Sequence, residues 1–376
     1  MADTRGYLDH NATSPLRPEV SAAMVEAFSA WANPSSVHRR GAEARYLLEK
    51  ARRRIARALN AGDPESLLFT SGATEANNLV LSGFFSPGQK ALLIVPTAEH
   101  RAVLDCARAL ARRGSVELVE LDVDAEGRAV PVREVPPTRP ALLSAMVANN
   151  EVGSLNPVAD IAGWCSAAGV FFHTDAVQAL GRVPLDLQRT GAHFVTLTSH
   201  KVGGPKGVGL LWRSPDAPAL HPLTYGGAQE AGLRPGTESV PLAVGLATAV
   251  EIAVREQAEF ADRSARQIAR LWDLLQAGCP GIERNSPAES CLPNTLNVAL
   301  QGRPSQELVR DLDRAGFAVS AGSACTSGGG ESPSHVLIAM GLSKDRASSS
   351  LRISIGPTTT DDEIEAFSHA LCALAP

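Results

Sequence analysis

The stretch FVTLTSHKVGGPKGVGLLW, residues 194–212, contains two apolar runs joined by a glycine-rich turn. The runs Phe194–Thr198 and Val208–Trp212 have the length and composition that are typical of buried strands. Lys201 lies between them, beside a histidine. Burial at a strand end favours the neutral form of an amine, and a neutral amine is a nucleophile. Most lysines are solvated surface residues instead, so a chemical role depends on partners elsewhere in the chain.

Short apolar runs alternate with helical patterns over residues 67–212. This alternation is typical of a mostly parallel sheet with helices on both faces. The helical patterns include Arg101–Arg112 and Ala159–Ala168. We therefore predict an α/β fold with a mostly parallel seven-stranded sheet, whose strands are Leu67–Thr70, Ala91–Val95, Val116–Leu121, Ala141–Val147, Val170–Thr174, Phe194–Thr198 and Val208–Trp212.

The pattern changes after a long helical stretch at about Val240–Gln276. The rest of the chain predicts a smaller α+β domain, with strands and helices at Asn294–Leu300, Gln306–Ala315, Ser334–Met340, Leu351–Ile355 and Asp361–Ala373. We expect a large domain of residues 14–255 and a small domain made of residues 1–13 and 256–376.

The composition argues against several classes of function. The net charge of −5 on 376 residues is mild, so we expect no direct contact with nucleic acid or an anionic membrane. No apolar run approaches the roughly 20 residues that a membrane-spanning helix needs. The N-terminus lacks the basic and then apolar pattern of a secretory signal, so we expect a cytoplasmic protein. The six cysteines form no C-x-x-C pair, and we expect no metal site.

A segment of small residues, Thr70-Ser71-Gly72-Ala73-Thr74-Glu75, follows the first strand and opens a helix. Small side chains there let backbone N–H groups approach an anion, which the helix dipole also favours. Ala73 and Thr74 are therefore candidates for a phosphate-binding cradle. The alternative is an ordinary helix start, in which Thr74 and Asn77 only satisfy backbone groups.

An aspartate ends the apolar run in His173-Thr174-Asp175-Ala176-Val177-Gln178, where a carboxylate is costly to bury without a cation. The protonated nitrogen of a pyridine ring is such a cation, and the pairing makes the ring a better electron sink. We expect Lys201 on the neighbouring strand, so both groups would meet one cofactor, pyridoxal phosphate. Gln178, one helical turn onward, would reach the hydroxyl side of the ring. The alternative for Asp175 is a helix N-cap.

His100 and the pair Asn149 and Asn150 are weaker candidates for the same cleft. His100 begins a helix, where the dipole favours a neutral ring that can stack on an aromatic cofactor. A lone histidine is more often structural. Two asparagines at a strand end form turns by default, although an amide there could also hydrogen-bond the ring oxygen or a substrate carboxylate.

Three features after residue 230 complete the set. Cys325 lies in a loop of glycine, serine and alanine, where a thiol is accessible and reactive. Arg352 lies on the apolar run Ser350–Ser354 and needs an anionic partner, which is either a substrate α-carboxylate or a structural salt bridge. The segment Arg234-Pro235-Gly236-Thr237-Glu238 is either a phosphate contact from a neighbouring subunit or a surface turn.

In this order, the motifs resemble those of fold type I enzymes that use pyridoxal phosphate, and more closely those of the group I cysteine desulfurases of the NifS/IscS class. The resemblance extends from residue 7 to about residue 356, and its most specific part is Ser323-Ala324-Cys325-Thr326-Ser327. The other matching segments are Tyr7-Leu8-Asp9-His10-Asn11-Ala12-Thr13, Asn33-Pro34-Ser35-Ser36, Thr70-Ser71-Gly72-Ala73-Thr74-Glu75, Glu99-His100, Asn149-Asn150-Glu151-Val152-Gly153, His173-Thr174-Asp175-Ala176-Val177-Gln178, Ser199-His200-Lys201, Gly204-Pro205-Lys206-Gly207 and Arg234-Pro235-Gly236-Thr237.

The resemblance implies a role for each candidate. Lys201 would bind pyridoxal phosphate covalently, Asp175 would pair with its ring nitrogen, and His100 would stack on the ring and assist proton transfer. Gln178 and Asn150 would contact the ring oxygen. The cofactor phosphate would be bound by Ala73, Thr74, Thr198, His200 and, from the partner in a homodimer, Thr237.

The resemblance also implies the reaction. Arg352 and Asn150 would bind the carboxylate of L-cysteine, and Cys325, in the small domain, would accept its sulfur. We therefore predict a cysteine desulfurase that releases L-alanine and passes sulfur to an acceptor protein, such as an iron–sulfur scaffold or a thiolation enzyme. The alternatives are a selenocysteine lyase, a small-amino-acid aminotransferase of the same fold or, from another class, a sulfur-relay scaffold without catalysis.

Overall fold

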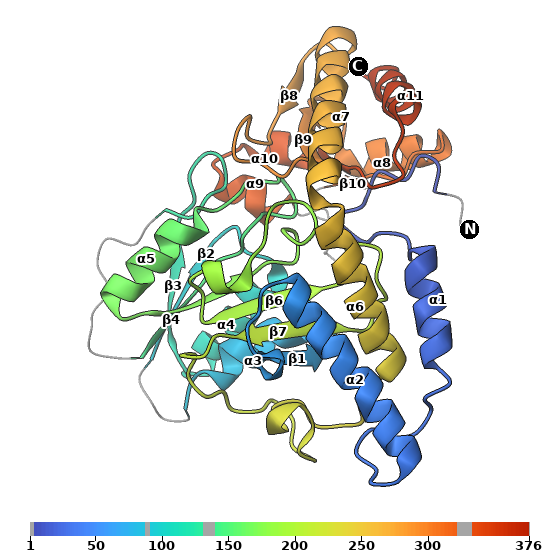
Figure 1. The fold of residues 1–376 in the computed structure, drawn as a ribbon. Helices are drawn as coiled ribbons and strands as arrows, with labels where there is room; N and C mark the ends of the chain where they lie inside the picture. The colour runs from blue at the N-terminus through green and yellow to red at the C-terminus, as the bar shows by residue number, and fades with distance from the viewer. Residues whose placement is uncertain (1–3, 87–90, 131–139, 322–332, 376) are drawn as a thin grey trace.

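The computed structural model describes residues 4–86, 91–130, 140–321 and 333–375, which form two sheets with helices packed around them (Figure 1). Within these residues the larger sheet has seven strands, β1 (Leu67–Thr70), β2 (Leu92–Pro96), β3 (Glu117–Leu121), β4 (Ala141–Ser144), β5 (Phe171–Asp175), β6 (Phe194–Thr198) and β7 (Gly209–Arg213). Their spatial order is β1–β7–β6–β5–β4–β2–β3. Among these strands, the pairs that β7 makes with β1 and β6 are antiparallel, and the other pairs are parallel. The predicted mostly parallel seven-stranded sheet is confirmed.

The side chains of the larger sheet pack into two hydrophobic cores, one on each face, because successive residues of a strand point to opposite faces. Leu67 and Phe69 of β1 belong to one core, and Leu68 between them belongs to the other. The first face is covered by α2 (Arg39–Ala58), α5 (Val158–Ala168) and α6 (Val240–Arg255), and the second by α3 (Ala73–Gly83) and α4 (Arg101–Arg112). Helices on both faces are what a buried parallel sheet requires.

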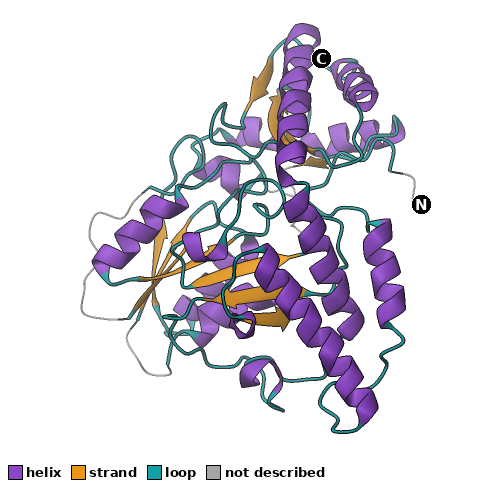
Figure 2. Ribbon diagram, in the orientation of Figure 1, coloured by secondary structure: helices purple, strands orange, loops and turns teal. Residues whose placement is uncertain are grey.

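The smaller sheet is antiparallel and lies at one end of the molecule, with its own helices (Figure 2). Its order is β10–β11–β9–β8. Leu8, from the N-terminal segment, packs in its core with Ile353 and Phe367. The strands and helices of this part are α7 (Gln257–Gly278), β8 (Ile282–Arg284), β9 (Thr295–Leu300), α8 (Ser305–Arg314), β10 (Ser320–Ala321), α9 (His335–Ala339), α10 (Lys344–Ser348), β11 (Ser350–Ser354) and α11 (Asp361–Cys372).

The long helical stretch expected over residues 240–276 consists of two helices rather than one. Glu256, with φ −93° and ψ 0°, separates α6 from α7. Its carboxylate pairs with Arg17, just before α1 (Pro18–Ala27), at 2.7 Å. The break lets α6 follow the larger sheet while α7 reaches the smaller one (Figure 1). No helix among the described residues is long and apolar enough to cross a membrane.

The register of the larger sheet brings the predicted site segments to one edge. Asp175, the last residue of β5, pairs with Thr196 on β6. Gly209, at the start of β7, pairs with Thr198 on one side and with Thr70 on the other. Since the loops at the carboxyl ends of parallel strands gather at one edge of a sheet, ligands bind there in open α/β sheets.

Candidate active site

A cavity of about 540 Å³ lies at this edge of the larger sheet. It is lined by ten of the twelve residues that the sequence singles out, namely Ala73, Thr74, His100, Asn150, Asp175, Gln178, Thr198, His200, Lys201 and Arg352. Thr237 does not line it. Cys325 lies outside the described residues, with the rest of its loop.

Asp175 is held by two hydrogen-bond donors. Asn77, a fully buried residue of α3, donates its side-chain N–H to one carboxylate oxygen at 2.8 Å. The backbone N–H of Val177 donates to the other at 3.0 Å. The bond from Val177 is a local side-chain-to-backbone contact of the kind that the N-cap alternative for Asp175 predicts. Asp175 makes this contact and also lines the cavity. Together the two donors fix the orientation of the Asp175 carboxylate at the cavity wall.

Lys201 follows β6 and turns its amine toward the N-terminal segment. The Nζ atom donates to the carbonyl oxygens of Asn11 at 2.8 Å and Ala12 at 2.6 Å. A tight turn after the lysine makes this placement possible. Gly203 has φ +81°, and a Cβ on Gly204 would come within 2.3 Å of the Ser199 side chain. Glycine is required at both positions because a side chain would be strained or would collide.

The start of α3 is open toward an anion. The N-cap residue is Gly72, which has no side chain to accept a hydrogen bond from the first N–H groups of the helix. A Cβ on Gly209 would come within 2.5 Å of the Gly72 backbone, so β7 closes against the cradle only because residue 209 is glycine. No side-chain cap bond forms at the N-cap, and Ala73 and Thr74 line the cavity at this helix start. Their role in binding phosphate stays a prediction.

The two histidines of the cavity are both kept neutral by burial. His100 is the N-cap of α4, and its Nδ1 accepts a hydrogen bond from the backbone N–H of Ala102 at 3.1 Å, which leaves the proton of the neutral ring on Nε2. Burial lowers the pKa of His100, while nearby Asp175 opposes the change. Burial, and then the charge of Lys201, lowers the pKa of His200 to about 4.

Arg352 makes the salt bridge that the sequence offered as one of two alternatives, and it also lines the cavity. It is 2 % exposed on β11, donates to Asp9 at 2.6 Å and to the carbonyl of Asn150 at 3.1 Å, and lines the cavity. Its Nε is buried without a hydrogen-bond partner among the described residues. The salt bridge to Asp9 is thus present, and these two bonds use only two of the five N–H donors of the guanidinium.

The two asparagines divide their tasks. The Asn149 side chain accepts from the backbone N–H groups of Glu151 and Val152 and shapes the turn. Asn150 lines the cavity. Gln178 donates to the carbonyl of Asn11 at 3.1 Å and accepts from Arg182, so its amide is fixed at the cavity wall.

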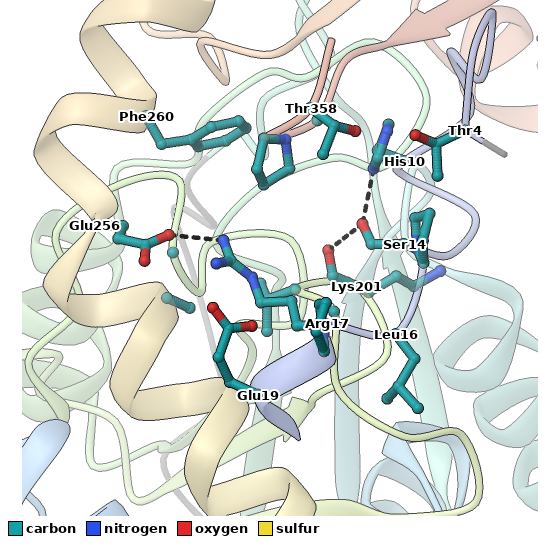
Figure 3. A pocket seen from close by; sticks show the side chains of 18 of the residues that line it. Thr4, His10, Ser14, Leu16, Arg17, Glu19, Lys201, Glu256, Phe260 and Thr358 are labelled. Atoms are coloured by element: carbon teal, nitrogen blue, oxygen red, sulfur yellow. Dashed lines mark hydrogen bonds and ion pairs between the residues drawn. The ribbon is translucent and has the colours of Figure 1, made fainter. Parts of the chain in front are cut away.

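A second cavity, of about 740 Å³, lies across the N-terminal segment (Figure 3). Of the predicted site residues, only Lys201 borders it among the described part of the chain. His10 is hydrogen-bonded to Ser14, which donates to the backbone carbonyl of Lys201, and the Arg17–Glu256 ion pair lies at the far wall (Figure 3). These contacts fix the segment that carries Asn11 and Ala12 between the two cavities.

Several lining residues were not among the sequence candidates, namely Asn11, Ala12, Thr13, Asn77, Met146 and Lys206. Asn11 to Thr13 belong to a matched N-terminal motif, but that motif carries no local sign of contact with residue 201. Asn77 could have been predicted from the sequence. A polar residue on the buried face of a helix, one turn after the cradle, needs a hydrogen-bond partner.

Comparisons with known proteins identify the family of this chain. The family model for aminotransferase class-V matches residues 6–367, and the chain belongs to that family. It is 41 % identical to a cysteine desulfurase of Frankia sp. (strain EuIK1), over 95 % of this chain and 88 % of the relative. It is 40 % identical to the putative cysteine desulfurase IscS 1 of Bacillus subtilis (strain 168), over 96 % of each. A solved NifS-like protein superposes with a TM-score of 0.89 and 33 % identity, over 98 % of this chain and 99 % of that chain.

Proposed function

We propose that this protein is a cysteine desulfurase, which removes the sulfur atom of L-cysteine and releases L-alanine. The observation that carries the proposal is a single cavity lined by Lys201, Asp175, the open start of α3 and Arg352. An amine, a carboxylate, an anion cradle and a guanidinium are the groups needed to hold an amino acid against pyridoxal phosphate. Similarity over nearly the whole chain to proteins named cysteine desulfurase supports the same assignment.

The cavity fits pyridoxal phosphate in its charge and its donors. The uncapped N–H groups at Ala73 and Thr74 would bind the phosphate, together with Thr198 and His200. Asp175 would face the ring nitrogen, and Lys201 would bond to the aldehyde carbon. When bound, the cofactor supplies a sink for the electron pair left on the substrate carbon.

The protein side chains would bind the substrate and move its protons. Arg352 would bind the α-carboxylate through guanidinium N–H groups that the bonds to Asp9 and Asn150 do not use, with Asn150 beside it. Lys201 would take the proton from Cα, since a neutral amine is a base. His100 would assist with the proton on Nε2, which its N-cap bond leaves free of the backbone.

The sulfur step would belong to Cys325. Its thiolate would bond to the sulfur of the substrate while the bond between that sulfur and Cβ breaks. The electron pair stays with the carbon, which takes a proton and leaves as part of alanine, and Cys325 is left as a persulfide. An acceptor protein, such as an iron–sulfur scaffold or a thiolation enzyme, would then receive the sulfur.

A homodimer would complete the site with Thr237. Ten large hydrophobic side chains are exposed among the described residues, and six of them lie between residues 16 and 46 while two more are Leu223 and Tyr225. A cavity beside α2 is lined by six residues from the stretch 34–52 and by five from the stretch 228–238, so these two stretches are neighbours. Exposed apolar surface of this extent supports a covered face, and Thr237 lies exposed in the same region.

The test is the fate of the substrate sulfur in the protein with its cofactor bound. After incubation with L-cysteine without a reductant, we expect the peptide that contains Cys325 to gain the mass of one sulfur atom. Cys325→Ala should retain the cofactor and yield no sulfide. Cys106→Ala is the matched control, because burial raises the pKa of the Cys106 thiol and keeps it unreactive. Normal sulfide output from the Cys325 variant would refute the assignment.

A further inference from the structure

The segment Gln229–Thr237 begins with two residues in an unusual backbone conformation. Glu230 has φ 48° and ψ 52°, and Ala231 has φ 55° and ψ 28°. Neither is glycine, so both occupy the left-handed region at a steric cost. Such a conformation persists only where the surroundings hold it.

One buried ion pair holds this turn, and we call it the clamp. Arg52, on α2, donates two parallel hydrogen bonds to the carboxylate of Glu230, at 2.9 and 2.8 Å. The side chains of Arg52 and Glu230 are only 6 % and 1 % exposed. Glu230 also accepts from the backbone N–H of Phe69 at 2.9 Å, and Arg52 donates to the carbonyl of Leu67. The clamp thus joins the turn to β1.

A second ion pair joins the same segment to α3. Arg234 donates to Glu75 at 3.2 Å, and the other oxygen of Glu75 accepts from the backbone N–H of Ser71 at 2.6 Å. Residues 69–75 are the strand end and helix start that form the phosphate cradle. The Gln229 side chain accepts from the backbone N–H of Gly236, which closes the segment on itself. Its geometry is therefore fixed relative to the cradle.

Thr237 follows Gly236 directly. It is exposed and does not line the active-site cavity of its own chain. Because Thr237 is exposed at the end of this fixed segment and does not line the cavity of its own chain, it is accessible to a site in another subunit. We propose that Arg52 and Glu230 are positioning residues for the cofactor phosphate, which set Thr237 for the cradle of a second copy of the chain. This inference rests on the proposed function and its homodimer.

The test compares cofactors with and without a phosphate group. In the apo-protein, Arg52→Met/Glu230→Met removes the clamp, and Kd is measured for pyridoxal phosphate and for pyridoxal. We expect the Kd for pyridoxal phosphate to rise about tenfold, since a hydrogen bond to a charged group contributes on that order. The Kd for pyridoxal should stay at its wild-type value. Thr237→Ala should weaken phosphate binding similarly, and adding it to the clamp variant should have little further effect.

A matched control lies two residues away in the same helix. Arg54 makes a bidentate ion pair with Glu251 of α6, at 3.0 and 2.6 Å, and neither residue touches the segment. Arg54→Met/Glu251→Met should change neither Kd. Glu230→Gln, which keeps an oxygen for the Phe69 N–H, should shift the pyridoxal phosphate Kd in the same direction if the double variant does not fold.

These Kd measurements distinguish a failure of the clamp proposal from a failure of the proposed function. Equal weakening of pyridoxal and pyridoxal phosphate, or no weakening of either, would overturn the clamp and leave the proposed function intact. A wild-type protein that binds no pyridoxal phosphate would overturn both.

Discussion

Asn77→Ala removes the side-chain donor to the carboxylate that would face the cofactor ring. Asn77 is fully buried and reaches Asp175 at 2.8 Å, and its own oxygen has no hydrogen-bond partner among the described residues. The main interaction of its amide is therefore with Asp175. The substitution leaves the Val177 N–H as the remaining donor of the two that hold this anion.

The magnitude follows from the charge on the acceptor. A hydrogen bond to a charged group contributes about 1.5–3 kcal/mol, which corresponds to roughly a 10- to 100-fold change in an equilibrium constant. With one donor lost, Asp175 is less well oriented toward the ring nitrogen, and we expect the Kd for pyridoxal phosphate to rise within that range. Pyridoxal should weaken equally, because the ring and not the phosphate is affected.

The assay is an absorbance titration of the apo-protein with each cofactor, with the unfolding midpoint measured in parallel. Asn78→Ala is the matched control, since the neighbouring asparagine donates to the carbonyl of Thr74 at 2.8 Å and makes no bond to Asp175. An unchanged Kd in Asn77→Ala would refute the reasoning, as would an equal rise in the control.

Two further predictions concern Arg352, which lines the cavity, and Glu151, a buried carboxyl outside its lining. Arg352→Lys loses the bidentate geometry that a guanidinium offers, so the KM for L-cysteine should rise about tenfold or more in steady-state assays, and an unchanged KM would argue against a carboxylate site. Burial raises the pKa of Glu151 from 4.5 to about 7, against the opposing effects of the Ser334 hydroxyl and Arg352. Because the folded state holds its proton more tightly, unfolding free energy should fall by roughly 3 kcal/mol as pH rises through this interval, and Glu151→Gln should lack that component in urea titrations. Identical pH dependence of both proteins would contradict it.

The regular elements and the strand ends could be predicted because both depend on local sequence. Apolar runs predict buried strands, and the residue after each run falls at the edge where ligands bind. Asp175, Lys201 and Ala73 were found in this way, and one cavity joins them.

Contacts across large sequence separations could not be predicted. Nothing near Lys201 indicates that Asn11 and Ala12, about 190 positions away, accept its hydrogen bonds. The break at Glu256 was not predicted because the helical sequence pattern continues through this residue. The helix breaks there because α6 packs on the larger sheet and α7 on the smaller one. The division at residues 13 and 255 and the position of Cys325 stay predictions.

The most direct test of the central claim is the amount of alanine and of sulfide formed from L-cysteine by the wild-type protein with its cofactor and a thiol reductant. A cysteine desulfurase with Lys201 as its base gives equal amounts of both, and Lys201→Ala gives neither. A keto acid formed without sulfide would contradict the account and would assign an aminotransferase reaction to the same cavity.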